Sequence, residues 1–161
     1  MNMKKQILLI IATAFASTMP LFAQIEKAAM RTTGISCGTC AAVSEIYLRQ
    51  LGGFDKIKIS ISNEAIMVSY KAGAAFRPKD IRDALKKTDV GILQFQISAR
   101  GQVQEQNGKR MFIAGKDTLL LVQGSNTPAV PANTPVMVEG ILNDQASPME
   151  LKVLSLKPIT K

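Results

Sequence analysis

The sequence has no histidine and no tryptophan, and it has only two cysteines among its 161 residues. The absence of imidazole excludes histidine-based acid–base catalysis and histidine ligands to a metal. Aromatic residues make up 5% of the chain, which leaves few side chains that could stack on nucleic-acid bases. The sequence also shows no pair of carboxylates and no nucleophile–base set, so we do not expect an enzyme.

Acidic residues are fewer than basic ones, and the formal net charge is +8. The lysines and arginines are spread along the chain and form no dense run of the kind that favours nucleic acid. We therefore expect no nucleic-acid partner. A mildly basic surface is still suited to steering the protein toward an acidic partner.

The N-terminal region carries the only apolar run of note, and it is too short to span a bilayer. Lys4 and Lys5 precede about ten apolar residues at positions 7–16, and Pro20 follows them. This order is typical of a secretory signal peptide with Ala23 at the cleavage site; a site after residue 16 and a retained anchor are the alternatives. We expect residues 1–23 to be removed, the protein to be periplasmic, and no integral membrane segment to remain.

The two cysteines are Cys37 and Cys40, and two residues separate them. A loop that runs into a helix brings such a pair onto one soft metal ion or into one disulfide. Cu(I), Ag(I) and Hg(II) suit two thiolates, whereas Zn(II) needs four ligands, which this chain cannot complete with histidine or further cysteine. A helix N-terminus at Cys40 is expected to lower the pKa of its thiol. A redox pair and a purely structural pair remain as alternatives.

The hydrophobic pattern of residues 25–99 predicts strand, helix, strand, strand, helix and strand. Alternation with a period of two indicates the strands, and the apolar stripes, Pro78 and the glycines after residue 51 indicate the helices. The predicted strands are 25–33, 54–61, 66–70 and 93–99, and the helices are 39–51 and 78–87. This order is typical of the α+β ferredoxin-like βαββαβ fold, in which two helices cover one face of an antiparallel sheet. It places Cys37 and Cys40 near Val90 and Gly91.

Residues 25–99 resemble the heavy-metal-associated domain family, found in copper chaperones, in metal-pumping ATPases and in the periplasmic mercury-binding protein. The motif that carries the resemblance is Gly34-Ile35-Ser36-Cys37-Gly38-Thr39-Cys40. The resemblance implies that Cys37 and Cys40 are the metal thiolates, and that a metal-pumping ATPase or an efflux component is a partner. The chain departs from the family pattern at Ile35, where methionine is usual, at Ser44, and in residues 88–91, which lack the usual lysine or aromatic residue.

Residues 100–161 show a different pattern, with short strands, many turn signals and no helix. The predicted strands are 101–105, 110–113, 118–122, 135–142 and 151–156. Such spacing predicts a small closed or half-closed β-barrel, and it is similar to OB-fold domains. Phe112 is the only aromatic residue in this half, so we expect a structural or protein-docking module rather than a nucleic-acid surface.

The sequence therefore predicts a signal peptide at 1–23, a heavy-metal-associated domain at 24–99 and an OB-like β-barrel domain at 100–161. The expected function is metal transport, sequestration or resistance, with one soft ion bound by Cys37 and Cys40. Cu(I) is the favoured ion, and Hg(II), Ag(I) and Zn(II) are the other candidates. The alternatives are a thiol–disulfide redox or redox-sensing module, and an adaptor whose barrel recruits a partner.

Overall fold

The structure is a computed structural model, and it describes residues 23–122, 127 and 129–159. The predicted signal peptide lies outside the described residues except for Ala23. Within the described part, no helix has the length and apolar character that crossing a membrane requires.

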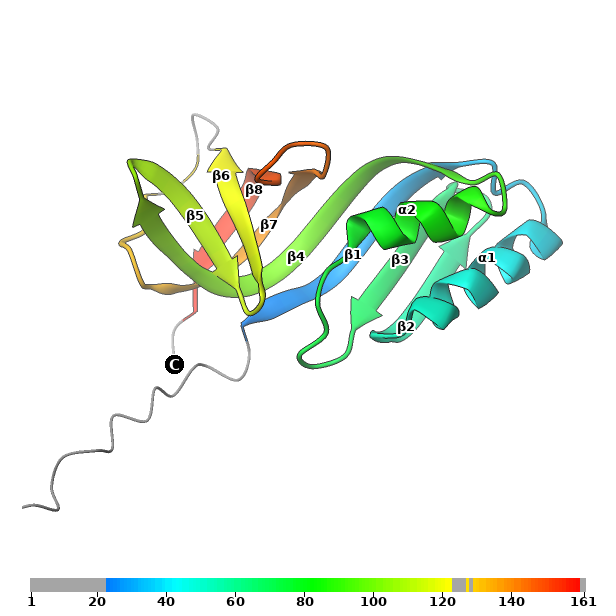
Figure 1. Cartoon of the computed structure of the whole chain (residues 1–161), viewed down its shortest axis with the longest axis horizontal. Helices are drawn as coiled ribbons and strands as arrows, with labels where there is room; N and C mark the ends of the chain where they lie inside the picture. The colour runs from blue at the N-terminus through cyan, green and yellow to red at the C-terminus, as the bar shows by residue number, and fades with distance from the viewer. Residues whose placement is uncertain (1–22, 123–126, 128, 160–161) are drawn as a thin grey trace, which may run out of the picture.

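The first half of the chain forms an antiparallel sheet with both helices on one side of it (Figure 1). Its strands lie in the order β2-β3-β1-β4, which with the two crossover helices is the predicted βαββαβ topology. The elements are β1 (Gln24–Thr33), α1 (Gly38–Leu51), β2 (Phe54–Ser60), β3 (Ala65–Tyr70), α2 (Pro78–Lys86) and β4 (Gly91–Gln106). All pairings within this sheet are antiparallel.

The core of this half lies between the sheet and the helices. Buried residues alternate with more exposed ones along β3 and along β1 from Ala28 onward, as the period of two predicts. Strand β2 alternates less clearly, and none of its residues is fully buried. Helix α2 buries Ile81, Ala84 and Leu85, which recur with the helical period that predicts one apolar stripe. Helix α1 buries only Ser44 and Leu48 completely, because its outer side is not covered by another element. The sequence predicts an apolar face widened by Val43, Ile46 and Tyr47, but the buried face is narrower, and Ile46 is 55% exposed.

The second half closes into a five-stranded barrel, which confirms the predicted barrel architecture; its OB-like character remains a prediction. It adds β5 (Lys109–Ala114), β6 (Asp117–Val122), β7 (Pro135–Asn143) and β8 (Glu150–Pro158). The order β4-β5-β6-β8-β7 is closed by hydrogen bonds between β7 and β4. The pairing of β6 with β8 is parallel, and the other pairings are antiparallel.

Strand β4 belongs to both halves, whereas the sequence predicts two separate strands here (Figure 1). Its residues 91–100 pair with β1, residues 95–102 pair with β7, and residues 102–106 pair with β5. Gly101, the predicted start of the second strand, is buried inside β4, where a Cβ would overlap the backbone of Ile113. The predicted domain boundary after residue 99 therefore falls inside a continuous strand.

Candidate metal centre

The connection between β1 and α1 carries the Cys-x-x-Cys pair and is fixed at its base by Gly34. Gly34 has φ 91°, in the region that favours glycine. A Cβ at Gly34 would lie 2.5 Å from the carbonyl oxygen of Asp89. Thr33, just before it, pairs with Gly91. The start of the connection thus lies against residues 89–91, and the nearness of Cys37 and Cys40 to Val90 and Gly91 stays a prediction.

Ile35 lies beneath the connection and is completely buried. It forms part of the hydrophobic core together with Leu48 and Val90. Ile35 therefore supplies an apolar side chain under the connection between β1 and α1. Burial of such a side chain stabilises the fold by about 1.5–3 kcal/mol, and it anchors the loop to the core.

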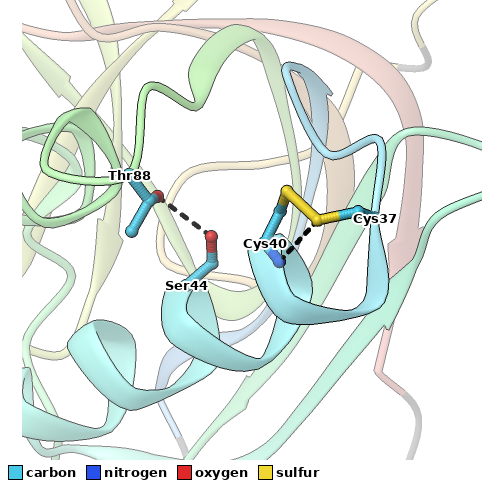
Figure 2. Close-up of a disulfide and its surroundings, with 4 residues drawn as sticks. All are labelled: Cys37, Cys40, Ser44 and Thr88. Carbon is cyan, nitrogen blue, oxygen red and sulfur yellow. Dashed lines mark hydrogen bonds between the residues drawn. A yellow bond between two sulfur atoms is a disulfide. The ribbon is translucent and has the colours of Figure 1, made fainter.

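Cys37 and Cys40 lie side by side at the first turn of α1 (Figure 2). They form a disulfide, with their Cα atoms 5.1 Å apart. Cys37 is the N-cap of the helix, and its Sγ accepts a hydrogen bond from the backbone N–H of Cys40 at 3.0 Å. The helix begins at Gly38, so the residue that caps its N-terminus is Cys37, and Cys40 lies within the first turn. The Cys37 side chain is exposed, and Cys40 is partly covered.

A hydrogen bond that the sequence did not predict holds α1 against the neighbouring loop. The hydroxyl of Ser44 lies 3.0 Å from that of Thr88 (Figure 2). Thr88 Oγ1 donates to the carbonyl of Leu85 at 2.8 Å, so Ser44 is the donor to Thr88. Ser44 is completely buried, and its hydroxyl needs this partner. The signal in the sequence was the polar residue on the apolar face of the helix, one turn after Cys40.

Lys87, just before the loop of residues 88–91, makes a cation–π contact with Tyr47. The Lys87 ammonium lies over the ring of Tyr47, 5.2 Å from its centroid. This contact fixes Lys87 beside the middle of α1, beyond Ser44 along the helix. The loop of residues 88–91 itself carries no cation, as the sequence predicts.

The donor set at the site consists of two sulfurs. In the described part of the chain, no group of three or more histidine, cysteine, aspartate or glutamate residues is arranged to hold a metal ion. Two thiolates fit a soft ion of low coordination number, and they do not by themselves complete the four ligands of zinc. An ion held there would be open to solvent on the side of Cys37, since that side chain is exposed.

Comparison with family models and with curated proteins finds no match to this chain. Three solved structures similar to part of it are small domains. The CopZ metallochaperone is 19% identical, with a TM-score of 0.38, over 42% of this chain and 98% of its own. The N-terminal domain of ZntA in the apo-form is 23% identical, with a TM-score of 0.38, over 43% and 90%. A copper binding domain from HMA7, a P-type ATPase, is 20% identical, with a TM-score of 0.37, over 43% and 95%. Matches at these identities and scores do not assign the chain to a family.

Proposed function

We propose that the protein is an exported metal-binding protein that holds one soft ion, Cu(I) in preference, between the sulfurs of Cys37 and Cys40. The observation that carries this proposal is the placement of two cysteines together at the exposed first turn of α1. Delivery, sequestration and resistance are the roles that such a site serves. The proposal includes no enzymatic step.

Metal binding needs the reduced form of the pair. Two electrons and two protons convert the disulfide to two thiols, and an incoming ion displaces the thiol protons as it binds the sulfurs. The hydrogen bond from the Cys40 N–H to Cys37 Sγ favours negative charge on that sulfur, as does the N-terminal end of the helix dipole. The site therefore supports thiolate ligands without a neighbouring cation.

Transfer of the ion depends on access to the sulfurs. Because the Cys37 side chain is exposed, a thiol of a partner protein can approach the ion before either bond to this chain is broken. The proposed partner is a metal-pumping ATPase or an efflux component. The uncovered side of α1, where Ile46 is 55% exposed, is available to such a partner.

The test is an anaerobic Cu(I) titration of the reduced chain from Gln24 to Lys161 against a competing chelator. The expected result is tight binding of one ion per chain. Cys37→Ser/Cys40→Ser is expected to lose this binding, because hydroxyls are poor ligands for Cu(I). Equal binding by the double variant, or weak binding by the parent chain, would contradict the proposal. Parallel titrations with Ag(I), Hg(II) and Zn(II) rank the ions by their affinity for the site.

A second candidate is a thiol–disulfide redox or redox-sensing module, favoured by the bond between Cys37 and Cys40. The cysteines are accessible and share one helix turn, which suits exchange with another thiol. Equilibration with glutathione measures the reduction potential of the pair. A potential in the range of thiol–disulfide enzymes, combined with failure of the Cu(I) titration, would favour the redox function.

A further inference from the structure

The sheet β2-β3-β1-β4 has a second face, opposite the helices, which no element of the described structure covers (Figure 1). Residues that alternate with the buried ones point to this face. Strand β3 contributes Ala65, Met67 and Ser69, and Met67 is 51% exposed.

The strand register turns this face into a trough with a floor of short or apolar side chains. Strand β3 lies between β2 and β1. Ser69 pairs with Lys56 on one side and with Lys27 on the other. Met67 pairs with Lys58 on one side and with Ala29 on the other. A groove of about 380 Å³ lies here, lined by Lys27, Asp55, Lys56, Lys58, Met67, Val68 and Ser69.

The charge of the trough is positive, although Glu139 of β7 lines an adjoining hollow together with Lys27 and Met67. Its lining has three lysines and one aspartate, Asp55. Arg31 adds a fourth exposed cation on the same face of β1. None of these four cations takes part in the ion pairs formed among the described residues. The hydroxyl of Ser69 is buried and has no hydrogen-bond partner in the same part of the chain.

We propose that this trough binds an acidic, extended segment of a partner protein. Lys56 and Lys58 on β2 are separated from Lys27 and Arg31 on β1 by two strand spacings, about 10 Å. An extended segment laid along β3 directs successive side chains to opposite sides, so its carboxylates reach the cations of both walls. The Ser69 hydroxyl lies under the backbone of such a segment, and Met67 meets its apolar parts.

The chemistry favours a peptide over a bilayer surface. A lipid-binding face inserts several large apolar side chains, whereas Met67 is the one exposed large apolar side chain among the described residues that line the groove. The proposal is independent of the metal site, since the trough lies across the sheet from α1 and the cysteine turn. Cys37→Ser/Cys40→Ser is therefore expected to bind an acidic segment as well as the parent chain does.

The test uses hexaglutamate as the probe and amide chemical shifts of the ¹⁵N-labelled chain from Gln24 to Lys161 as the readout. The shifts are expected to change at Lys27, Lys56, Lys58, Met67 and Ser69. The variant Lys27→Glu/Lys58→Glu is expected to bind at least about tenfold more weakly, because each change replaces an attraction with a repulsion. Its own amide spectrum shows whether it remains folded.

The matched control is Lys86→Glu/Lys109→Glu, which changes the net charge equally at exposed positions on α2 and β5. It is expected to keep the amide shifts at the trough and to weaken binding less than threefold. Equal weakening by both variants, shift changes centred on α2, or no binding would overturn the proposal. Binding to vesicles containing phosphatidylglycerol but not to hexaglutamate would also overturn it, in favour of a membrane surface.

Discussion

The guanidinium of Arg82 on α2 donates to both carboxylate oxygens of Asp144, in the connection between β7 and β8. Nε lies 2.6 Å from Oδ2, and Nη2 lies 2.8 Å from Oδ1. Nη1 donates to the carbonyl of Ile92 at 2.8 Å, and the group lies over the ring of Phe95. The Asp144 side chain is 6% exposed. This pair joins the helical half of the molecule to the barrel.

Asp144→Ala is expected to destabilise the protein by about 2 kcal/mol, because it leaves the half-buried Arg82 guanidinium without its carboxylate. Urea unfolding followed by circular dichroism measures the change. The control removes an ion pair that is exposed to solvent. Lys79 and Asp83 on α2 form such a pair, and Asp83→Asn is expected to leave the urea midpoint of unfolding unchanged. Equal effects of the two variants would show that Arg82 and Asp144 contribute no more than a surface pair.

The same pair makes stability depend on pH. The hydrogen bond from Arg82 lowers the pKa of Asp144, and the charge of Arg82 adds to this effect, while burial opposes it. A pKa that is lower in the folded than in the unfolded state gives stability that is present above the unfolded value, about 3.9, and is lost as the pH falls through the folded value. The difference in unfolding free energy between the parent chain and Asp144→Asn should therefore be largest near pH 6 and shrink below about pH 4. A difference that grows on acidification would contradict this assignment.

Asp117, a second carboxylate between the helical half and the barrel, is expected to change the pH dependence of stability in the opposite direction to Asp144. Asp117 accepts a hydrogen bond from the Phe76 N–H at 3.2 Å, but burial raises the pKa of its carboxyl. Burial, and then the charge of Asp117, also raises the pKa of Tyr70. A raised pKa in the folded state means that stability is full below the unfolded pKa and is lost as the pH rises through the folded one.

Asp117→Asn should therefore stabilise the protein at pH 7, since the amide oxygen still accepts from Phe76 and carries no charge. Thermal unfolding across pH 3–7 measures the effect, and the gain should disappear near pH 3, where Asp117 is protonated in both states. A loss of stability at pH 7 would mean that the carboxylate charge, and not only the acceptor, is needed by Phe76.

The base of the cysteine loop gives a prediction about the site. Gly34→Ala is expected to destabilise the protein by about 2 kcal/mol or more, because φ is 91° and a Cβ would meet the carbonyl of Asp89. Gly38→Ala is the matched control, since a Cβ there meets nothing within 4 Å. Urea midpoints that fall equally in the two variants would show that Gly34 is not needed for the close approach.

The order of the elements in the first half could be predicted from local patterns. Ile57 and Ile59 alternate with lysines, and Pro78 starts a helix whose apolar residues recur every three or four positions. The placement of Cys37 and Cys40 at a helix start followed from the same order. These features depend on residues close together in the sequence, which is where periodicity is informative.

The features that the sequence did not predict depend on residues far apart in it. The sequence predicts that one strand ends at residue 99 and another begins at residue 101, yet β4 is continuous because Gly101 permits the close approach of Ile113. Arg82 and Asp144 are 62 positions apart, and Ser44 and Thr88 are 44 apart. No local pattern specifies such partners, since they are selected by tertiary packing.

The most direct test of the two-sulfur site is X-ray absorption at the copper edge of the anaerobic, Cu(I)-loaded chain from Gln24 to Lys161. Cys37 and Cys40 are the proposed ligands, and no group of three candidate ligands is arranged within the described residues. The expected spectrum has two sulfur neighbours and no nitrogen or oxygen neighbour. A copper ion with no sulfur neighbour, or one with the same spectrum in Cys37→Ser/Cys40→Ser, would contradict the account.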